Sequence, residues 1–359
     1  MDIIASTKSY ESWLAKRTQI VAGDLRLKHR LMADEVFPFF RATFYRWLQC
    51  WHDVCPRTAE APRVLAVGDL HVENFGTWRD LEGRLIWGIN DFDEVSHMPY
   101  TIDLVRLTAS ALLAADCEHL ALKPRHIAEC IEDGYRRSLD ARGRPFVLSE
   151  RQGWLRRVAL HQIVEGPVFW EKLRALPAVS ETQVPAAARA GIERAMPERG
   201  LRYGYARRGA GLGSRGHQRF VSLVNWRGGF IAREAKALVP AAAVWLRHHS
   251  RTGPILYAEV LRRSVRVPDP HFKVDGRWII RRLSPNCRKI YLRDLPVRRN
   301  EERLLESMGA ETANVHLGTA RAREVIRRDL ARRPKDWLLD AACDMVKFVR
   351  RDWKDWRYA

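Results

Sequence analysis

The segment VGDLHVENFGTW, residues 67–78, follows a short apolar run and ends in Phe-Gly-Thr-Trp. Within it, an Asp, a His, a Glu and an Asn lie among the six consecutive positions 69–74. Polar side chains at the end of a strand are typical of either a solvent-facing turn or an active-site loop, because loops carry function on a rigid scaffold. The rest of the sequence has to distinguish these two interpretations.

The spacing of Asp69 and Asn74 favours the second interpretation. In phosphoryl-transfer loops of the kinase type, an Asp accepts the proton of the substrate hydroxyl and an Asn five positions later holds Mg²⁺. A second acidic segment, INDFDE at 89–94, ends the strand expected at Leu85–Ile89. Carboxylate oxygens suit Mg²⁺, so Asp91 is the in-register candidate ligand, and Asp93 is expected either to take that role or to hold a second ion.

These motifs resemble those of known protein families. GDLHVENFG, INDFDE and MPYTIDLVRL resemble the GDxHxxN and IDF motifs of aminoglycoside and choline kinases. They are more closely similar to a bacterial family of uncharacterised kinase-like proteins, and the similarity continues in KHRLMADEVFPFFRATF, GLGSRG, REAKAL and RRLSP, which covers most of the chain. The resemblance implies a protein-kinase-like fold with Asp69 as the base and Asn74 as a metal ligand.

One position departs from the small-molecule kinases. Val67 stands where they carry a His before the Gly-Asp, so a contact that braces the loop has to come from elsewhere. His71 is expected to brace the loop and not to take part in the chemistry. Asp103 follows at the start of a helix, where a carboxylate accepts backbone hydrogen bonds, and is expected to be structural.

A glycine-rich segment occupies residues 209–216. Its G-x-G-x-x-G pattern leads into an alternating strand, Phe220–Val224, and not into the helix that a dinucleotide-binding loop requires. This context fits a glycine loop folded over phosphates between two strands; a flexible hairpin turn is the alternative. The residues expected to bind the nucleotide here are Gly211, Gly213, Ser214 and Gly216.

A cation on the next strand, Phe230–Ala235 and its continuation, is expected to hold the nucleotide phosphates. Arg233 and Lys236 are both candidates, and side chains alternate along a strand, so only one of them can easily face the nucleotide. The similar family often has Lys at the position of Arg233, whereas Lys236 is the more familiar choice chemically. The sequence leaves both open.

The pattern along the chain predicts an α+β protein. Helix is expected over 9–50, 100–115 and much of 116–195, strands at 63–67, 85–89, 220–224, 230–235, 278–282 and 289–292, and helix again from 301. We expect a mainly helical lobe (1–195), a β-rich nucleotide lobe (196–295) and C-terminal helices (296–359) that pack on the first. Because the catalytic motifs precede the glycine loop, the kinase-like two-lobed fold is expected to be circularly permuted, which is feasible when termini lie close together.

Composition limits the remaining possibilities. Lys and Arg outnumber Asp and Glu by 62 to 43, a net charge of +19, which predicts attraction to polyanions such as nucleotides or nucleic acid. The basic residues are spread along the chain and interleaved with acids, so nucleic-acid binding is possible but not favoured. The six cysteines have no zinc-like spacing, and no signal peptide or membrane span is evident, so a cytoplasmic protein with no membrane partner is expected.

The leading functional hypothesis is an ATP- and Mg²⁺-dependent phosphotransferase with an unknown acceptor. A catalytically inactive or nucleotidyl-transferring kinase-like scaffold, possibly bound to nucleic acid, is the alternative from another class. A metallophosphoesterase is a third hypothesis, since such sites also open with GDxH, but the further His and Asn motifs that a binuclear site needs do not occur in this sequence. The acceptor and the oligomeric state are not predicted.

Overall fold

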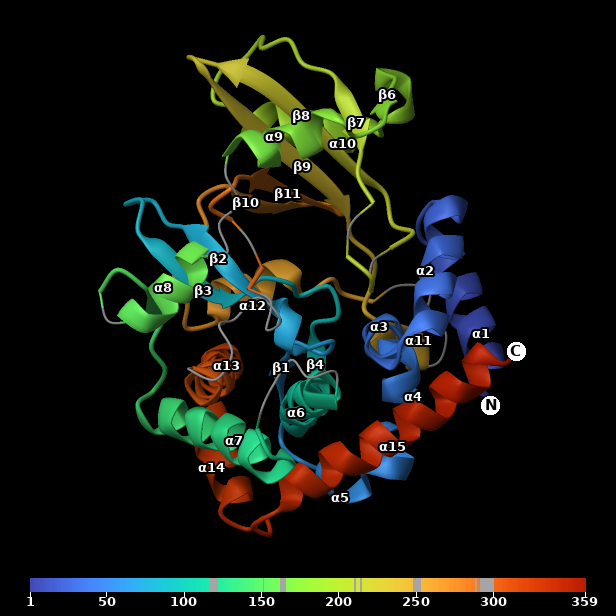
Figure 1. Ribbon diagram of the computed structural model, residues 1–359, viewed down its shortest axis with the longest axis vertical. Helices are drawn as coiled ribbons and strands as arrows, with labels where there is room; N and C mark the ends of the chain where they lie inside the picture. The colour runs from blue at the N-terminus through green and yellow to red at the C-terminus, as the bar shows by residue number, and fades with distance from the viewer. Residues whose placement is uncertain are drawn as a thin grey trace.

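A computed structural model describes residues 1–116, 122–150, 152–161, 166–209, 211–213, 215–247, 253–287, 289–290 and 300–359. Helices fill the lower part of the molecule in Figure 1, and a twisted antiparallel sheet lies above them. Helices and several antiparallel sheets confirm the α+β class. Among the described residues, no helix combines the length and apolar character needed to cross a membrane.

The N-terminal region is helical, as its periodicity predicts. Its helices are α1 (Ile3–Ala15), α2 (Ala22–Asp34), α3 (Val36–Ala42), α4 (Phe44–Val54) and α5 (Pro56–Ala59). Asp2 caps α1, because its Oδ1 accepts the Ala5 N–H at 2.7 Å. One face of α4 buries Phe44, Trp47 and Trp51, which attaches this region to the main core.

Helix α6 (Thr101–Asp116) runs through the centre of the helical part (Figure 1). Residues 101–114 are all buried, including the charged Asp103 and Arg106, so the helix is enclosed by protein on every side. The helix predicted at 100–115 is therefore confirmed. The remaining helices of this part are α7 (Pro124–Asp140), α8 (Gly153–His161), α13 (Glu301–His316), α14 (Ala322–Leu330) and α15 (Trp337–Arg357).

Two small antiparallel sheets carry the acidic motifs. Strand β1 (Arg63–Ala66) pairs with β4 (Ser96–Pro99), and β3 (Leu85–Ile89) pairs with both β2 (Phe75–Arg79) and β5 (Phe146–Val147). The expected strands at 63–67 and 85–89 are present. Strand β2 was not predicted, because its residues were assigned to the motif loop; the structure pairs it with β3 in a hairpin.

The third sheet has the order β10-β11-β9-β8-β7-β6, and all neighbouring strands are antiparallel. Its strands are β6 (Ala178–Val179), β7 (Tyr205–Arg207), β8 (Arg219–Trp226), β9 (Gly229–Ala237), β10 (Phe272–Asp275) and β11 (Trp278–Leu283). The strands predicted at 220–224, 230–235 and 278–282 lie within β8, β9 and β11. Of the strand expected at 289–292, Lys289 forms an isolated bridge to Gly76, and 291–292 lie outside the described residues.

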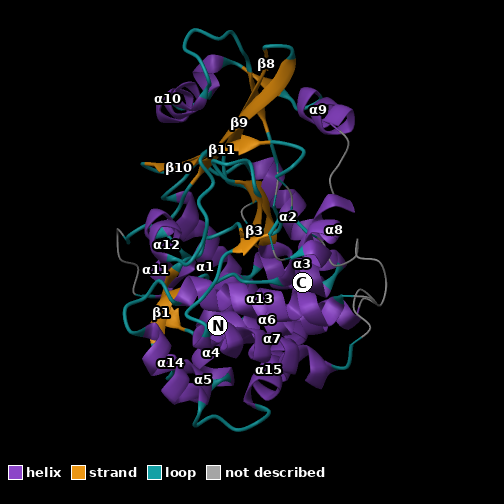
Figure 2. Cartoon of the chain, turned by 90° about the vertical axis from the view of Figure 1, so that its left-hand side faces the viewer, coloured by secondary structure: helices purple, strands orange, loops and turns teal. Residues whose placement is uncertain are grey.

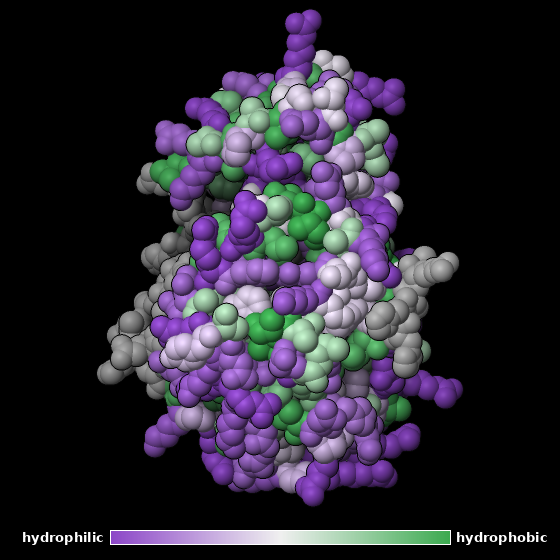
Figure 3. Space-filling model, turned by 90° about the vertical axis from the view of Figure 1, so that its right-hand side faces the viewer, coloured by the Kyte–Doolittle hydropathy of each residue, from purple (hydrophilic) through white to green (hydrophobic). Residues whose placement is uncertain are grey.

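Helices cover both faces of this sheet (Figure 2). Helix α10 (Ala186–Ala195) packs on one face, and α9 (Gly166–Arg174) packs on the other. Between β9 and β10 the chain returns toward the helical part through α11 (Ala242–Leu246) and α12 (Tyr257–Arg263). On the face drawn in Figure 3, hydrophobic side chains gather at mid-height, at the junction of the sheet and the helices.

Candidate functional site

The loop that carries Asp69 leaves β1 with its backbone fixed by a buried carboxylate. Asp103, in the first turn of α6, accepts the Val67 N–H at 2.7 Å and the Gly68 N–H at 2.8 Å. The same carboxylate lies 2.9 Å from Nε2 of His316 in α13, and both side chains are fully buried. Asp103 is therefore structural, and together with His316 it braces the loop that follows β1.

Gly68 allows the two acidic segments to approach each other. Its φ is +88°, and a Cβ at this position would lie 2.5 Å from the carbonyl oxygen of Glu94. Any other residue would have to move the backbone of the INDFDE segment. Asp69 and the segment 89–94 are therefore held against each other by close backbone packing.

His71 and Asn74 stabilise a short 3₁₀ turn, η1 (Val72–Asn74). Nδ1 of His71 accepts the Glu73 N–H at 3.2 Å, and Oδ1 of Asn74 accepts the His71 N–H at 3.1 Å. Burial holds the pKa of His71 well below its ordinary value, with smaller contributions from neighbouring cations, so the ring is neutral. His71 has the bracing contact that was expected of it, and Asn74 keeps a second lone pair on Oδ1 for another ligand.

Arg106 holds Asp69 through one of the two carboxylate oxygens of Asp69. Its Oδ1 accepts hydrogen bonds from Nε of Arg106 at 2.9 Å and from Nη2 at 2.5 Å. Arg106 in α6 is itself completely buried, donates to the Phe40 carbonyl, and lies over the rings of Phe40, Phe44 and Trp47. Burial raises the pKa of Asp69, and the charge of Arg106 opposes this increase.

The other oxygen of Asp69 faces the glycine segment. A Cβ on Gly213 would lie 3.3 Å from Asp69 Oδ2 and 3.2 Å from the Arg41 carbonyl, closer than side chains normally pack. Glycine at this position lets the segment lie directly over Asp69. Gly211 and Gly213 both line the cavity that contains Asp69.

One described residue of the predicted glycine loop, Gly216, is not part of this arrangement. Gly216 lines neither of the two cavities described below, and its carbonyl accepts the Val21 N–H at 2.9 Å. Ser214 lies outside the described residues.

Asp91 and Asp93 form a cluster with two lysines. Lys236 Nζ contacts Asp93 Oδ2 and lies 3.5 Å from Asp91 Oδ1, and Lys289 Nζ lies 3.9 Å from Asp91 Oδ2. Burial alone would raise the pKa of Asp91, but the two ammonium groups outweigh it and lower the pKa. Burial, followed by the negative charge of Asp91, raises the pKa of Asp93.

The structure separates Arg233 from Lys236. Lys236 lies on the face of β9 that meets Asp91 and Asp93. Arg233 points to the opposite face, where its Nε donates to the Ala195 carbonyl in α10 at 2.7 Å. Of the two candidates, only Lys236 lies with the acidic cluster.

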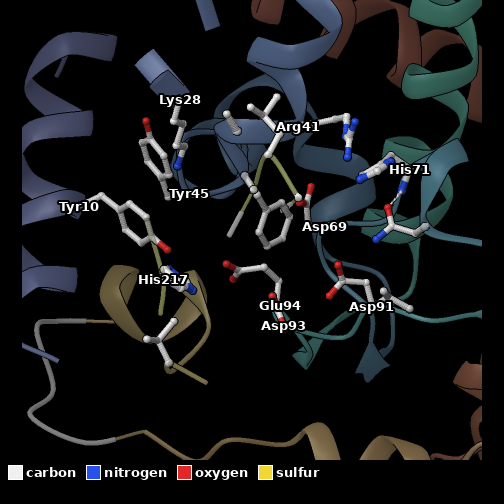
Figure 4. Close-up of a pocket in the computed structure, with 18 of the residues that line it drawn as sticks. Tyr10, Lys28, Arg41, Tyr45, Asp69, His71, Asp91, Asp93, Glu94 and His217 are labelled. Carbon is white, nitrogen blue, oxygen red and sulfur yellow. Dashed lines mark hydrogen bonds between the residues drawn. The ribbon is translucent and has the colours of Figure 1, made fainter. Parts of the chain in front are cut away.

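Two adjoining cavities meet at this cluster. The inner chamber, with a cavity volume of about 50 Å³, contains the predicted residues drawn together in Figure 4. The main cavity, of about 560 Å³, lies below the six-stranded sheet. Both are lined by Arg41, Asp91, Gly211 and Lys289. The predicted residues that line the inner chamber are Asp69, Asn74, Asp91, Asp93, Gly211 and Gly213.

Most of the Arg and Lys side chains at the site were not predicted from the sequence. Nine Arg or Lys side chains and only two carboxylates line the main cavity. On its sheet side, Arg208 and Arg281 hold the fully buried Glu234 through hydrogen bonds of 2.5 and 2.7 Å, and Arg219 approaches the same carboxylate at 3.6 Å. The alternation of side chains along β8, β9 and β11 was the one available signal. It puts Arg219, Glu234 and Arg281 on the same face of the sheet as Lys236.

The acidic cluster fits Mg²⁺ only together with a phosphate ligand. Oδ1 of Asp93 is buried and has no hydrogen-bond partner among the described residues, so it is free to bind a cation. Within the described part of the chain, however, no three His, Cys, Asp or Glu side chains gather as a metal site. Mg²⁺ typically uses one or two carboxylates and completes its shell with water and substrate phosphates. Asp91, Asp93 and Asn74 match that donor set.

Glu94 makes the stability of this site depend on pH. Its Oε2 accepts the Ala242 N–H at 2.6 Å, and burial raises its pKa to about 8. The folded protein therefore binds more protons than the unfolded chain between about pH 4.5 and 8, so the free energy of unfolding should fall as pH rises through this window. We expect Glu94→Gln to reduce the fall by an amount on the order of a few kcal/mol, measured by urea unfolding at pH 5, 6.5 and 8.

The control for this prediction is Glu150→Gln at an exposed position, which should leave the pH dependence unchanged. Glu311, whose pKa burial raises to about 7, acts in the same window, so the slope should decrease without vanishing. An unchanged slope in Glu94→Gln would contradict the assignment.

Comparison with known proteins identifies one family. Residues 20–165 match the model of a family described as an uncharacterised protein conserved in bacteria (DUF2252). The matched segment includes both acidic motifs and ends before the glycine segment. No curated protein and no solved structure matches the chain.

Proposed function

We propose that the protein is an ATP- and Mg²⁺-dependent phosphotransferase with a circularly permuted, kinase-like fold. The observation that carries the proposal is the contact of Lys236 with Asp91 and Asp93. About 145 residues separate the lysine from the aspartates along the chain, yet they meet beside Asp69 and below the glycine segment. Phosphoryl transfer needs these groups in one closed site, because catalysis rests on positioning and on charge stabilisation.

The order of structural elements supports the proposal. The glycine segment joins β7 to β8, and Lys236 lies on β9, the third strand of that series. Protein kinases likewise have a glycine-rich loop over the phosphates and a lysine on the third strand. In the other half of the site, the β2–β3 hairpin connects the Asp69–Asn74 loop to Asp91.

The main cavity has the size and charge that a nucleotide requires. Its volume of about 560 Å³ lies within the range of small-molecule sites, roughly 300–1,000 Å³. The excess of cations on its walls suits a triphosphate, so part of the +19 net charge is directed into the cavity. Its aromatic side chains offer apolar surface for a base: Trp78, Phe92, Phe169, Tyr257 and Phe272.

Each residue has a proposed role. Asp69 Oδ2 accepts the proton of the acceptor hydroxyl while Arg106 fixes Oδ1. Lys236 and Lys289 bind phosphate oxygens. Asp91, Asp93 and Asn74 hold Mg²⁺, which when bound neutralises charge on the transferring phosphate.

The test compares the two candidate cations of β9. We expect Mg²⁺-ATP to bind the parent protein in calorimetry and to raise its melting temperature, and Lys236→Met to weaken binding at least about tenfold, since a charge-assisted contact to phosphate is lost. Arg233→Met, on the opposite face of the same strand, is the matched control and should bind as the parent does.

Isotope placement distinguishes the alternatives. Label in the γ-phosphate of ATP should enter an acceptor from a cell lysate, whereas label in the α-phosphate should not. Transfer of the α-label would indicate nucleotidyl transfer, and binding with no transfer of either label would indicate an inactive scaffold. Failure of the parent to bind Mg²⁺-ATP would reject the proposal.

A further inference from the structure

The inner chamber extends beyond Asp69, away from the main cavity. Its far wall is formed by the N-terminal helices: Tyr10 comes from α1, Lys28 from α2 and Tyr45 from α4. In Figure 4 these side chains lie on the opposite side of Asp69 from Asp91. His217 and Glu94 complete this end of the chamber.

Three buried polar side chains in this chamber have no hydrogen-bond partner among the residues that the structure describes. They are Lys28, Tyr10 and His217, with 4%, 6% and 8% of their surface exposed. Lys28 also forms no ion pair with a described residue. A polar molecule bound in the chamber would give each of these three side chains a hydrogen-bond partner. Three such groups facing one small cavity indicate a polar ligand.

The charges in the chamber indicate an anion. Glu94 is already engaged, because its Oε2 accepts the Ala242 N–H at 2.6 Å. Burial lowers the pKa of His217 to about 3, so its ring is neutral and has one N–H to donate. The other carboxylates that line the chamber already have cationic partners: Asp69 pairs with Arg106, and Asp91 and Asp93 contact Lys236. Among the described residues that line it, the chamber therefore offers the donors of Tyr10 and His217 and the ammonium of Lys28, which has no ion-pair partner there.

The size of the chamber limits the ligand. A volume of about 50 Å³ holds roughly three to five water molecules. A compound of about four to six non-hydrogen atoms fits this space, whereas a sugar or a protein side chain with its backbone does not. The chamber adjoins Asp69 Oδ2, where the proposed function needs the acceptor hydroxyl.

We infer that the inner chamber is the acceptor site, and that it takes a small anionic hydroxy compound whose anionic group pairs with Lys28 and whose hydroxyl lies at Asp69. This inference rests on the proposed function. In the step it implies, the hydroxyl oxygen forms a bond to the γ-phosphorus of ATP, its proton passes to Asp69, the bond from the β,γ-bridging oxygen to that phosphorus breaks, and ADP leaves.

The test uses glycolate as the probe, because it combines a carboxylate and a hydroxyl in five non-hydrogen atoms. Ethylene glycol and ethanolamine, which are of similar size and carry a hydroxyl, serve as the neutral and cationic comparisons. Binding is measured by saturation-transfer NMR in the presence of Mg²⁺ and a non-hydrolysable ATP analogue. We expect only glycolate to bind the parent and Lys28→Met to weaken its binding at least tenfold.

Two further variants separate charge from fold. Tyr10→Phe keeps the shape of the chamber and removes one donor, so it should weaken glycolate binding less than Lys28→Met does. Lys8→Met removes an exposed lysine of α1 and should bind glycolate as the parent does. All variants should bind the ATP analogue equally.

Two results would overturn the inference: equal glycolate binding by the parent and Lys28→Met, or binding of ethanolamine or ethylene glycol as tight as that of glycolate. A different result would show that the proposed function is wrong. Glycolate binding that depends on Lys28, in a protein that does not bind Mg²⁺-ATP, would reject phosphoryl transfer and with it the acceptor role.

Discussion

Replacing Asp91 by alanine should remove the Mg²⁺ dependence of ATP binding and reduce phosphoryl transfer by about 10³-fold or more, because charge neutralisation by a bound metal contributes several kcal/mol to such reactions. The structure adds a second expectation. Asp91 lies near the ammonium groups of Lys236 and Lys289, so its removal frees Lys289 for the nucleotide and leaves Lys236 with Asp93 as its one acidic partner among the described residues. ATP without Mg²⁺ should therefore bind the variant at least as tightly as it binds the parent.

The variant should remain folded, since Lys236 keeps its contact with Asp93. Asp269→Ala is the matched control: it removes one carboxylate from the wall of the same cavity without touching the lysine cluster. Calorimetric titration with ATP, with and without Mg²⁺, gives both quantities for each protein. If Mg²⁺ still improves ATP binding to Asp91→Ala as much as it does in the parent, Asp91 is not the metal ligand and the site is not a phosphotransferase centre of this kind.

The sequence predicted the parts of this site that are encoded locally. A strand followed by Asp69, a second strand followed by Asp91, and a glycine segment before a hairpin are short-range patterns, and the structure has each of these elements where it was expected. The choice between Arg233 and Lys236 remained open. The alternation of side chains along a strand shows that the two residues point to opposite faces of the sheet, but it does not show which face meets the cavity.

Other features depended on contacts between distant segments and had no local signal. Lys28 lies in a stretch whose helical periodicity predicts core residues with charges between them, and a charged residue in such a pattern is normally solvated. Its burial results from tertiary packing, in which α2 lies against α3 and α15. Similarly, His316 and Glu311 brace the two acidic loops from α13, more than 200 residues further along the chain.

Arg106 shows how one tertiary contact changes a prediction. The sequence alone places Asp69 in a cleft and not in the core, which predicts that a variant at this position stays folded. In the structure, Asp69 is the ionic partner of a guanidinium that is fully buried among three aromatic rings. Removing the negative charge leaves Arg106 uncompensated, and breaking a buried pair costs about 3–5 kcal/mol.

Asp69→Asn should therefore affect both catalysis and stability. Turnover should fall about 10²- to 10⁴-fold, the usual effect of removing a general base, while Mg²⁺-ATP binding persists. The free energy of unfolding should fall by about 3 kcal/mol, at the low end of the range for a broken buried pair, because the amide oxygen can still accept from Arg106.

Glu73→Gln is the matched control: Glu73 lies in the same loop and pairs with Arg41 at 2.5 Å, and its loss should leave turnover within a few-fold of the parent. Turnover, calorimetry and urea unfolding on the three proteins separate these effects. The proposed role of Asp69 as a base concerns the acceptor, whereas its pairing with Arg106 concerns the fold. If Asp69→Asn loses stability but keeps full turnover, Asp69 only anchors Arg106, and another residue must act as the base.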